Sequence, residues 1–441
     1  MPSLVSQPHN VLTGKVTIPG DKSMSHRSLM LSALAVGESK ISGLLEGEDV
    51  LATADAMRAM GAKIERIGEG EWRVYGVGVG GLSSPDNIID VGNSGTSARL
   101  LMGLIASHDI TVMMTGDASL RGRPMGRVMN PLSEVGARFE ARDSKYLPAT
   151  IKGTDVPMPL DYTPPMASAQ VKSAVILAGL NTPGITTVRE KVATRDHTER
   201  MLSAMGADIT ITEENGERTV KLVGQPELKP VTLSVPGDIS SSAFILVAAS
   251  ILDGSDVTIE HVGMNPLRTG IIDALKAMGA NIELMHARNL GGEPVADIHV
   301  RGTKLKGVTE LSVDPSTMID EFPVLFCAAA VAEGTSRFTG LEEMRVKESD
   351  RIMVMAAGLK ANGVKVTEFD DGLEITGCSG KVPGGGMVET FLDHRIAMSF
   401  AVLGQMAEKP ITIDDASPIQ TSFPTFIDLM TGLGAGLLLG D

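Results

Sequence analysis

The chain has few aromatic side chains, which make up 3% of its 441 residues, and it contains one tryptophan. Nucleic-acid-binding proteins commonly stack bases on aromatic rings and neutralise phosphates with basic residues. Here acidic residues outnumber basic ones, so the formal net charge is −15. We therefore expect no nucleic-acid partner. An anionic ligand would need a local cluster of basic side chains within this acidic chain.

Cysteines and long apolar runs are also scarce. Cys327 and Cys378 are the two cysteines, and neither has a neighbouring cysteine or histidine at metal-ligand spacing. We expect reduced thiols in a cytoplasmic protein, and no metal site. No apolar run is long enough to cross a bilayer, and the opening residues do not resemble a signal peptide. A membrane partner is therefore not expected.

A turn built on glycine recurs six times, each time between a run with helical character and a short apolar strand. Glycine suits such a turn because it adopts the left-handed conformation that ends a helix. The spacing of roughly 70–85 residues is too long for a solenoid unit, so each repeat should be a small αβ lobe. The turns are centred on Gly61, Gly136, Gly206, Gly279, Gly363 and Gly434.

Helix caps and apolar spacing predict helices that alternate with β-hairpins, which is typical of an α/β fold. The helices are expected at residues 22–35, 50–60, 96–106, 167–180, 195–205, 240–252, 268–278, 320–332 and 393–406.

Three repeats precede residue 236 and three follow it. The phrase Pro19-Gly20-Asp21 returns as Pro236-Gly237-Asp238, so both sites could be strand-to-helix junctions where the chain crosses between domains. We therefore predict one domain from residues 21–235 and a second from residues 1–20 and 236–441. A single break near residue 235 is the alternative.

Basic and hydroxyl side chains cluster where the expected helices begin. Free N–H groups and the positive end of the helix dipole bind anions there. Each cluster taken alone could be a polar cap or a solvated charge run. The segments are 20–27, 92–99, 166–170, 194–199 and 393–395, whereas residues 320–321 place two carboxylates at the start of another expected helix, where they could complement the dipole or accept a proton.

Three local features carry more specific expectations. Pro124, after two arginines, could occupy the first position of a helix. A capping box could explain residues 194–199 without any ligand. Lys347 and Arg351 are four residues apart, so they would share a helix face.

Taken together and in order, these segments resemble the 5-enolpyruvylshikimate-3-phosphate (EPSP) synthase family of enolpyruvyl transferases. The resemblance covers almost the whole chain, and it implies a two-domain inside-out α/β barrel with three βαβαββ units in each domain, closing on a cleft. The matching phrases are Gly20-Asp21-Lys22-Ser23 with His26-Arg27, Gly92-Asn93-Ser94-Gly95-Thr96, Arg123-Pro124, Ser168-Ala169-Gln170, Lys347-Glu348-Ser349-Asp350-Arg351 and Asp393-His394-Arg395.

The resemblance implies transfer of the enolpyruvyl (carboxyvinyl) group of phosphoenolpyruvate to the 5-hydroxyl of shikimate 3-phosphate, with release of phosphate. This reaction belongs to the shikimate pathway of chorismate and aromatic amino acid biosynthesis. It needs no cofactor, and we expect a monomer.

The resemblance also implies roles for individual residues. The matching shikimate 3-phosphate contacts are Lys22, Ser23, Arg27, Ser168, Ala169, Gln170, Arg195, Asp320 and Lys347. The matching phosphoenolpyruvate contacts are Lys22, Gly95, Arg123, Gln170, Arg351 and Arg395.

The charges of the two substrates suit these basic residue types. The two substrates together carry roughly five to six negative charges, and a similar number of basic residues would face them. The resemblance further implies that Asp320 would accept the hydroxyl proton. Glu348, with Lys22, would move a proton to and from the methylene carbon, for which a pKa raised by burial near other acids would be useful.

Two departures from many relatives are visible. Ser97-Ala98-Arg99-Leu100 replaces a more usual Ala-Met-Arg-Pro, and Thr421 replaces a lysine. Both features resemble a divergent branch that includes members tolerant to glyphosate, some of which have alanine in place of Gly95. We expect Gly95 to leave room for the phosphonate of glyphosate.

Three other functions remain open. UDP-N-acetylglucosamine enolpyruvyl transferase has the same fold but usually presents a reactive cysteine in its phosphoenolpyruvate-binding half, whereas both cysteines here fall in the other domain. A non-catalytic sugar-phosphate binding protein is the second alternative. A small-molecule kinase is the third, although the segment around Lys22 does not fit a Walker A loop.

Overall fold

The structure is a computed structural model that describes residues 2–9, 11–290 and 292–440. The chain forms two compact units. Unit 1 consists of Met1–Pro19, Pro236–Asn289 and Pro294–Asp441, and unit 2 consists of Gly20–Val235 and Leu290–Glu293. Among the described residues, none of the helices combines the length and apolar character needed to traverse a bilayer.

Unit 2 contains three four-stranded sheets, ordered β14-β3-β5-β4, β6-β7-β9-β8 and β10-β11-β13-β12. In each sheet a short strand pairs in parallel with the first of three antiparallel strands. The strands are β3 (Val36–Ser42), β4 (Lys63–Gly68), β5 (Glu71–Val77), β6 (Ile89–Asp90), β7 (Thr111–Thr115), β8 (Arg138–Arg142), β9 (Tyr146–Lys152), β10 (Asp161–Tyr162), β11 (Ile185–Glu190), β12 (Ile209–Glu214), β13 (Glu217–Val223) and β14 (Thr232–Ser234).

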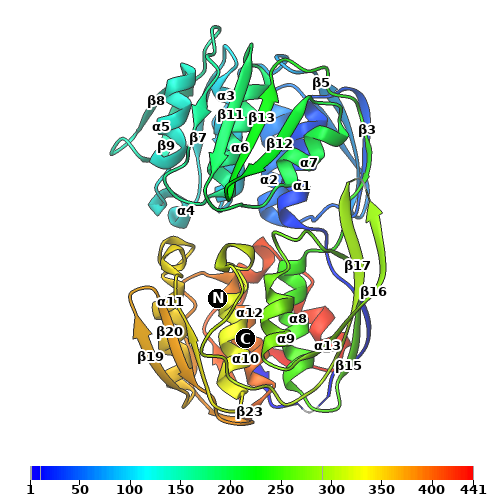
Figure 1. Cartoon of the computed structure of the whole chain (residues 1–441), viewed down its shortest axis with the longest axis vertical. Helices are drawn as coiled ribbons and strands as arrows, with labels where there is room; N and C mark the ends of the chain where they lie inside the picture. Colours follow the sequence, from blue (N-terminus) through cyan, green and yellow to red (C-terminus); the bar gives the residue numbers. More distant parts are fainter. Residues whose placement is uncertain (1, 10, 291, 441) are drawn as a thin grey trace. The chain divides into compact units, whose positions relative to one another are not determined.

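Three helices of unit 2, α1, α3 and α6, are buried on nearly all sides, and α3 packs against both α6 and α1 (Figure 1). A helix surrounded by apolar contacts belongs in the interior, so the helices form the centre and the sheets form the outside. The helices are α1 (Lys22–Ala33), α2 (Glu48–Ala59), α3 (Gly95–Ala106), α4 (Ala118–Gly122), α5 (Gly126–Val135), α6 (Ala169–Leu180) and α7 (His197–Ala204).

Unit 1 repeats this plan around α8, α10 and α12, which pack against one another (Figure 1). Its sheets are β16-β17-β15-β2, β18-β20-β19, β22-β24-β1-β25 and the pair β21-β23. The helices are α8 (Ile239–Ile251), α9 (Gly270–Ala277), α10 (Phe322–Val331), α11 (Arg351–Ala361), α12 (His394–Gly404) and α13 (Phe426–Gly432), with 3-10 helices η1 (Pro315–Thr317), η2 (Glu342–Val346) and η3 (Ser417–Thr421). The strands are β1 (Leu4–Gln7), β2 (Thr13–Thr17), β15 (Asp256–Gly263), β16 (Asn281–Leu290), β17 (Glu293–Arg301), β18 (Thr335–Phe338), β19 (Lys365–Phe369), β20 (Gly372–Thr376), β21 (Val382–Gly384), β22 (Met387–Val388), β23 (Ala407–Lys409), β24 (Ile411–Ile413) and β25 (Gly436–Leu439).

The six glycine turns define the repeat. All six glycines have positive φ, between 80° and 118°, and each stands between a helix and a strand. The second repeat, for example, runs β6, α3, β7, α5, β8 and β9, with the short α4 added before α5. The first sheet of unit 2 is completed by β14, and the N-terminal strands β1 and β2 complete two sheets of unit 1. The predicted α/β fold with repeated βαβαββ units is confirmed.

All nine predicted helices are present, with ends within two residues of the prediction, but two local predictions are wrong. Pro124 does not begin a helix, because α5 starts at Gly126 with Met125 as its N-cap. Lys347 and Arg351 do not share a helix face. The Asp350 side chain caps α11 by accepting from Met353 N at 3.0 Å, so this helix starts at Arg351.

Candidate functional site

In unit 2 the buried helices begin on capping side chains. Asp21 accepts from Met24 N at 2.8 Å, and Ser94 accepts from Ser97 N at 3.1 Å. A cap of this kind satisfies one N–H of the first turn and leaves the others without a helical acceptor. The first turns of α3 and α6 are joined by a hydrogen bond of 3.1 Å from Gln170 Nε2 to Thr96 Oγ1. The structure therefore brings predicted residues from separate repeats together.

Lys22 and Arg27 both project from α1. Lys22 Nζ lies 2.9 Å from Asp49 Oδ2 on α2. Arg27 is almost wholly buried and donates from Nη1 to the Ser23 carbonyl at 2.9 Å. Its Nε donates to Thr198 Oγ1 at 2.7 Å. Neutral oxygens thus hold the Arg27 guanidinium on two sides, which fixes its orientation.

Gly95, the first residue of α3, lies against two guanidinium groups. A Cβ added there would stand 3.0 Å from Arg99 Nη1 and 3.4 Å from Arg123 Nη1. Arg123 Nη2 donates to Asn93 Oδ1 at 2.5 Å, and Arg99 Nη1 donates to Gln170 Oε1 at 2.6 Å. Arg99, which was not among the predicted residues, therefore lies beside predicted residues Gly95 and Gln170. An arginine in an apolar helix seldom lacks a partner, and that signal could have identified it.

The segment 194–199 joins this group through α6. Arg195 is half-buried and follows Thr194, whose carbonyl accepts from Lys172 Nζ at 3.0 Å. Glu199 does not close a capping box, because its Oε1 lies 2.8 Å from Lys172 Nζ and the pair is fully buried. The capping-box alternative is therefore wrong.

In unit 1 the predicted residues gather around Arg351, whose side chain is 1% exposed. Its Nη2 lies 2.5 Å from Glu348 Oε2, its Nη1 lies 3.2 Å from Asp320 Oδ1, and its Nε lies 2.8 Å from Asp393 Oδ2. Burial alone would lower the pKa of Arg351, but the facing carboxylates raise it above its usual value.

Two further cations complete this cluster. Lys347 Nζ lies 3.4 Å from Asp320 Oδ1, and Arg395 Nη1 donates to the Asp320 carbonyl at 2.8 Å. Arg395 also lies 3.7 Å from Glu321 Oε1, an oxygen that accepts from Ser240 on α8. All five predicted residues of unit 1 therefore belong to one network. Glu321 and Ser240, which contact this network, were not among the predicted site residues.

Neither cysteine resembles a reactive thiolate. Burial raises the pKa of the Cys327 thiol well above its usual range, and Cys327 Sγ donates to the Ser399 carbonyl at 3.3 Å. Burial also raises the pKa of Cys378. A nucleophilic cysteine needs the opposite shift.

Thr421, which replaces the lysine usual in relatives, ends η3, and its hydroxyl donates to the Pro418 carbonyl at 2.8 Å.

Within the described residues, no group of three or more His, Cys, Asp and Glu side chains could hold a metal ion.

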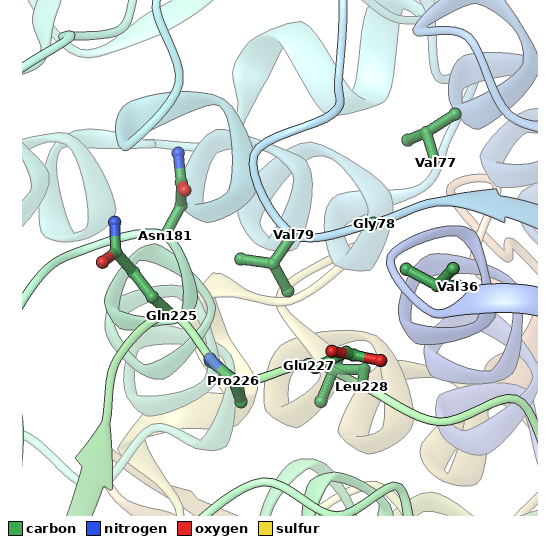
Figure 2. A pocket seen from close by; sticks show the side chains of 9 residues that line it. All are labelled: Val36, Val77, Gly78, Val79, Asn181, Gln225, Pro226, Glu227 and Leu228. Carbon is green, nitrogen blue, oxygen red and sulfur yellow. The ribbon is translucent and has the colours of Figure 1, made fainter.

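Unit 2 also has a cavity of about 430 Å³ that none of the predicted residues lines. It lies where buried helices end, since Asn181 is the C-cap of α6 and Val36 follows α1 closely. The negative end of a helix dipole disfavours anions, so this cavity does not suit an anionic substrate. Its lining residues are Val36, Val77, Gly78, Val79, Asn181, Gln225, Pro226, Glu227 and Leu228 (Figure 2).

Comparison with solved structures identifies the class of fold. The enolpyruvyl transferase NikO from Streptomyces tendae matches with a TM-score of 0.77 at 16% identity, over 100% of this chain and 99% of that one. At this identity the likeness establishes the fold alone. EPSP synthase from Acinetobacter baumannii matches with a TM-score of 0.88 and 45% identity over 100% of both chains.

The family follows from sequence. A family model for EPSP synthase (3-phosphoshikimate 1-carboxyvinyltransferase) matches residues 6–430, and the chain belongs to this family. The 3-phosphoshikimate 1-carboxyvinyltransferase of Parvibaculum lavamentivorans is 57% identical over 439 residues, which are 99% of this chain and 97% of that protein. The protein of the same name from Sphingopyxis alaskensis is 59% identical over 431 residues, 96% of each chain.

Proposed function

We propose that this chain is a 3-phosphoshikimate 1-carboxyvinyltransferase. It transfers the enolpyruvyl group of phosphoenolpyruvate to the 5-hydroxyl of shikimate 3-phosphate and releases phosphate. The observation that carries the proposal is identity of 57% and 59% along nearly the whole chain to relatives of that name. The two clusters of basic residues at helix starts suit two substrates that each carry a phosphate and a carboxylate.

Shikimate 3-phosphate would bind at the starts of α1 and α6. Arg27 supports this role because Thr198 and Ser23 hold its guanidinium in one orientation. N–H groups of the first turns would add donors to the phosphate. The full set of proposed contacts is Lys22, Ser23, Arg27, Ser168, Ala169, Gln170, Arg195, Asp320 and Lys347.

Phosphoenolpyruvate would bind where arginines predominate. Arginine suits this substrate because its planar guanidinium can bind a carboxylate or phosphate through two hydrogen bonds. Gly95 supports the assignment, since the absence of a side chain leaves space beside Arg99 and Arg123. The proposed contacts are Lys22, Gly95, Arg123, Gln170, Arg351 and Arg395.

Asp320 and Glu348 would handle the protons. Asp320 would accept the proton of the 5-hydroxyl as its oxygen bonds to C2 of phosphoenolpyruvate, while Glu348, with Lys22, protonates the methylene carbon. In the elimination, Glu348 then takes a proton back from the methyl carbon while the bond between C2 and the phosphate oxygen breaks, and phosphate leaves. Both carboxylates contact Arg351, so one side chain orients both groups.

The remaining expectations also stand as proposals. We propose a monomeric cytoplasmic enzyme that needs no cofactor and has neither a nucleic-acid nor a membrane partner. The net charge of −15 supports the absence of a nucleic-acid partner, because phosphate backbones would be repelled away from the local basic clusters.

A phosphate-release assay tests the function. The purified chain should release phosphate only when both substrates are present, and Asp320→Ala and Glu348→Ala should each lower kcat by at least about 100-fold. Full activity of either variant would remove its assigned role. Phosphate release with UDP-N-acetylglucosamine as the acceptor, in place of shikimate 3-phosphate, would favour the alternative transferase.

A further inference from the structure

A fully buried lysine lies one turn inside α6. The Lys172 side chain is 0% exposed, and its Nζ lies 2.9 Å from Glu190 Oε2 and 2.8 Å from Glu199 Oε1. It also donates to the Thr194 carbonyl at 3.0 Å. Lys172 therefore ties α6 to the end of β11, to the following loop and to α7. We call Lys172, Glu190, Thr194 and Glu199 the clamp.

If the clamp served only to pack the helices together, it would carry an unnecessary free-energy cost of desolvation. Two acids and one base are removed from water, and apolar side chains of similar volume often stabilise a protein as well or better. Burial raises the pKa of Glu190, and the nearby Lys172 ammonium opposes that shift. Such a group points to a need for fixed geometry at this place.

What the clamp fixes is the loop before α7. Glu190 Oε1 accepts from Thr194 N at 3.2 Å and also from the Thr194 hydroxyl. With the bond from Lys172 to the Thr194 carbonyl, the amide, the carbonyl and the side chain of this residue are all held. Arg195 follows Thr194, so the backbone position from which the Arg195 side chain extends is fixed.

A second bridge runs beside the clamp. Ser173 follows Lys172 on α6, and its hydroxyl lies 2.8 Å from Thr198 Oγ1 on α7. Arg27 donates to both hydroxyls, from Nη2 to Ser173 at 2.8 Å and from Nε to Thr198 at 2.7 Å. Consecutive residues of α6 thus hold consecutive residues of α7, and one of these bridges also holds Arg27.

We propose that Lys172 is a positioning residue for shikimate 3-phosphate: through the clamp it sets Arg195 directly and Arg27 through α7. The inference rests on the proposed function. The clamp determines affinity for shikimate 3-phosphate more than affinity for phosphoenolpyruvate, because Gly95 lies against Arg99 and Arg123, and Arg123 donates to Asn93, so other residues hold this part of the phosphoenolpyruvate site.

The test measures binding of shikimate 3-phosphate by calorimetry with the full chain. The main variant is the double substitution Lys172→Met with Glu199→Gln, which removes the lysine bridge and keeps the net charge of the cluster. We expect the dissociation constant for shikimate 3-phosphate to rise about 10- to 100-fold, because misplaced contacts lose affinity steeply. The KM for phosphoenolpyruvate should change less than about twofold.

A milder variant keeps the buried charges intact. Thr194→Val removes one hydroxyl and preserves volume, so folding should survive, and the dissociation constant should rise about three- to tenfold. The matched control is Gln405→Met in unit 1, a buried side chain that donates to Ser6 Oγ at 2.7 Å. It should lower Tm without changing affinity for shikimate 3-phosphate.

The outcomes separate the two claims. If the wild-type chain does not bind shikimate 3-phosphate, the proposed function fails. If the wild type binds it and the folded double variant binds it equally well, the positioning role is overturned. If the double variant does not fold, unchanged binding by Thr194→Val overturns the role instead. If Gln405→Met raises the dissociation constant for shikimate 3-phosphate as much as the double variant does, the positioning role is also overturned, because general destabilisation would then explain the loss of affinity.

Discussion

Arg351 Nε lies 2.8 Å from Asp393 Oδ2, and both side chains are almost completely buried. The same Asp393 carboxylate caps α12 by accepting from Arg395 N at 2.9 Å. One carboxylate therefore orients Arg351 and begins the helix that carries Arg395. Two proposed phosphoenolpyruvate contacts depend on it.

Asp393→Asn keeps a capping oxygen but removes the charge that faces Arg351. Asp393 is one of three carboxylates that face the buried Arg351, and its loss leaves that charge less well compensated, so the free energy of unfolding should fall by up to about 3 kcal/mol. The KM for phosphoenolpyruvate should rise about tenfold or more, as measured by steady-state kinetics with chemical denaturation in parallel. Asp350→Asn, which alters the more exposed cap of α11, is the control and should change KM little. Equal KM values in the Asp393 variant and the wild type would contradict the role.

Gly95→Ala should reduce inhibition by glyphosate. The new Cβ would stand 3.0 Å from Arg99 Nη1, so that guanidinium must shift and space beside Arg123 is lost. We expect the inhibition constant to rise at least about tenfold, with a smaller rise in the KM for phosphoenolpyruvate. Gly122→Ala is the matched control, since no atom lies within 4 Å of its added Cβ. An unchanged inhibition constant in Gly95→Ala would refute the explanation.

His26 predicts a dependence of stability on pH. Burial lowers its pKa well below the usual value, with Lys22 and Arg27 adding to the shift. The unfolded chain therefore binds a proton at His26 more readily than the folded chain does. Stability contributed by neutral His26 is present above about pH 6.5 and falls by up to about 1.4 kcal/mol per pH unit below it.

His26→Gln should remove that loss, because glutamine does not titrate. Urea unfolding at pH 7.5 and pH 5.5 gives the comparison, and the wild type should lose more stability between the two than the variant does. Thr53, whose Oγ1 lies 2.7 Å from His26 Nδ1, remains available to hydrogen-bond the amide. Identical pH dependence in both proteins would show that His26 is not responsible.

Exposed basic residues near Arg123 should speed capture of anionic substrates. Arg142 donates to the Arg121 carbonyl, and Arg142 and Lys145 both face the Tyr146 ring. Replacing Arg121, Arg142 and Lys145 together by glutamine should lower kcat/KM several-fold at low salt. The difference from the wild type should vanish at high ionic strength.

The matched control removes the same charge elsewhere, at Lys15, Lys40 and Lys63, each of which lies within 4.0 Å of a glutamate. Its kcat/KM should stay close to that of the wild type. A loss that persists at high salt, or one that the control reproduces, would rule out a local electrostatic effect.

Local signals in the sequence were sufficient for much of the fold. The glycine turns and helix caps act within a few residues, so the repeats and nine helices could be predicted. The same locality explains an error: Asp350 caps α11, and a spacing rule applied to Lys347 and Arg351 ignored that cap. The assignment of substrate contacts came from family resemblance, and it stays a prediction.

The supporting contacts of the site could not be predicted in this way. Arg351 and Asp393 are 42 residues apart, and Arg99 and Gln170 are 71 apart. Such pairs depend on how the repeats pack, which periodicity does not specify. Lys172 could have been suspected, because a lysine in an otherwise apolar helix needs a buried partner.

The most direct test of the account is phosphorus NMR of the purified chain with shikimate 3-phosphate and phosphoenolpyruvate, combined with mass spectrometry of the product. The account predicts equal amounts of inorganic phosphate and of a shikimate phosphate heavier by one carboxyvinyl group. Persistence of both substrates, or phosphate release without that product, would contradict it.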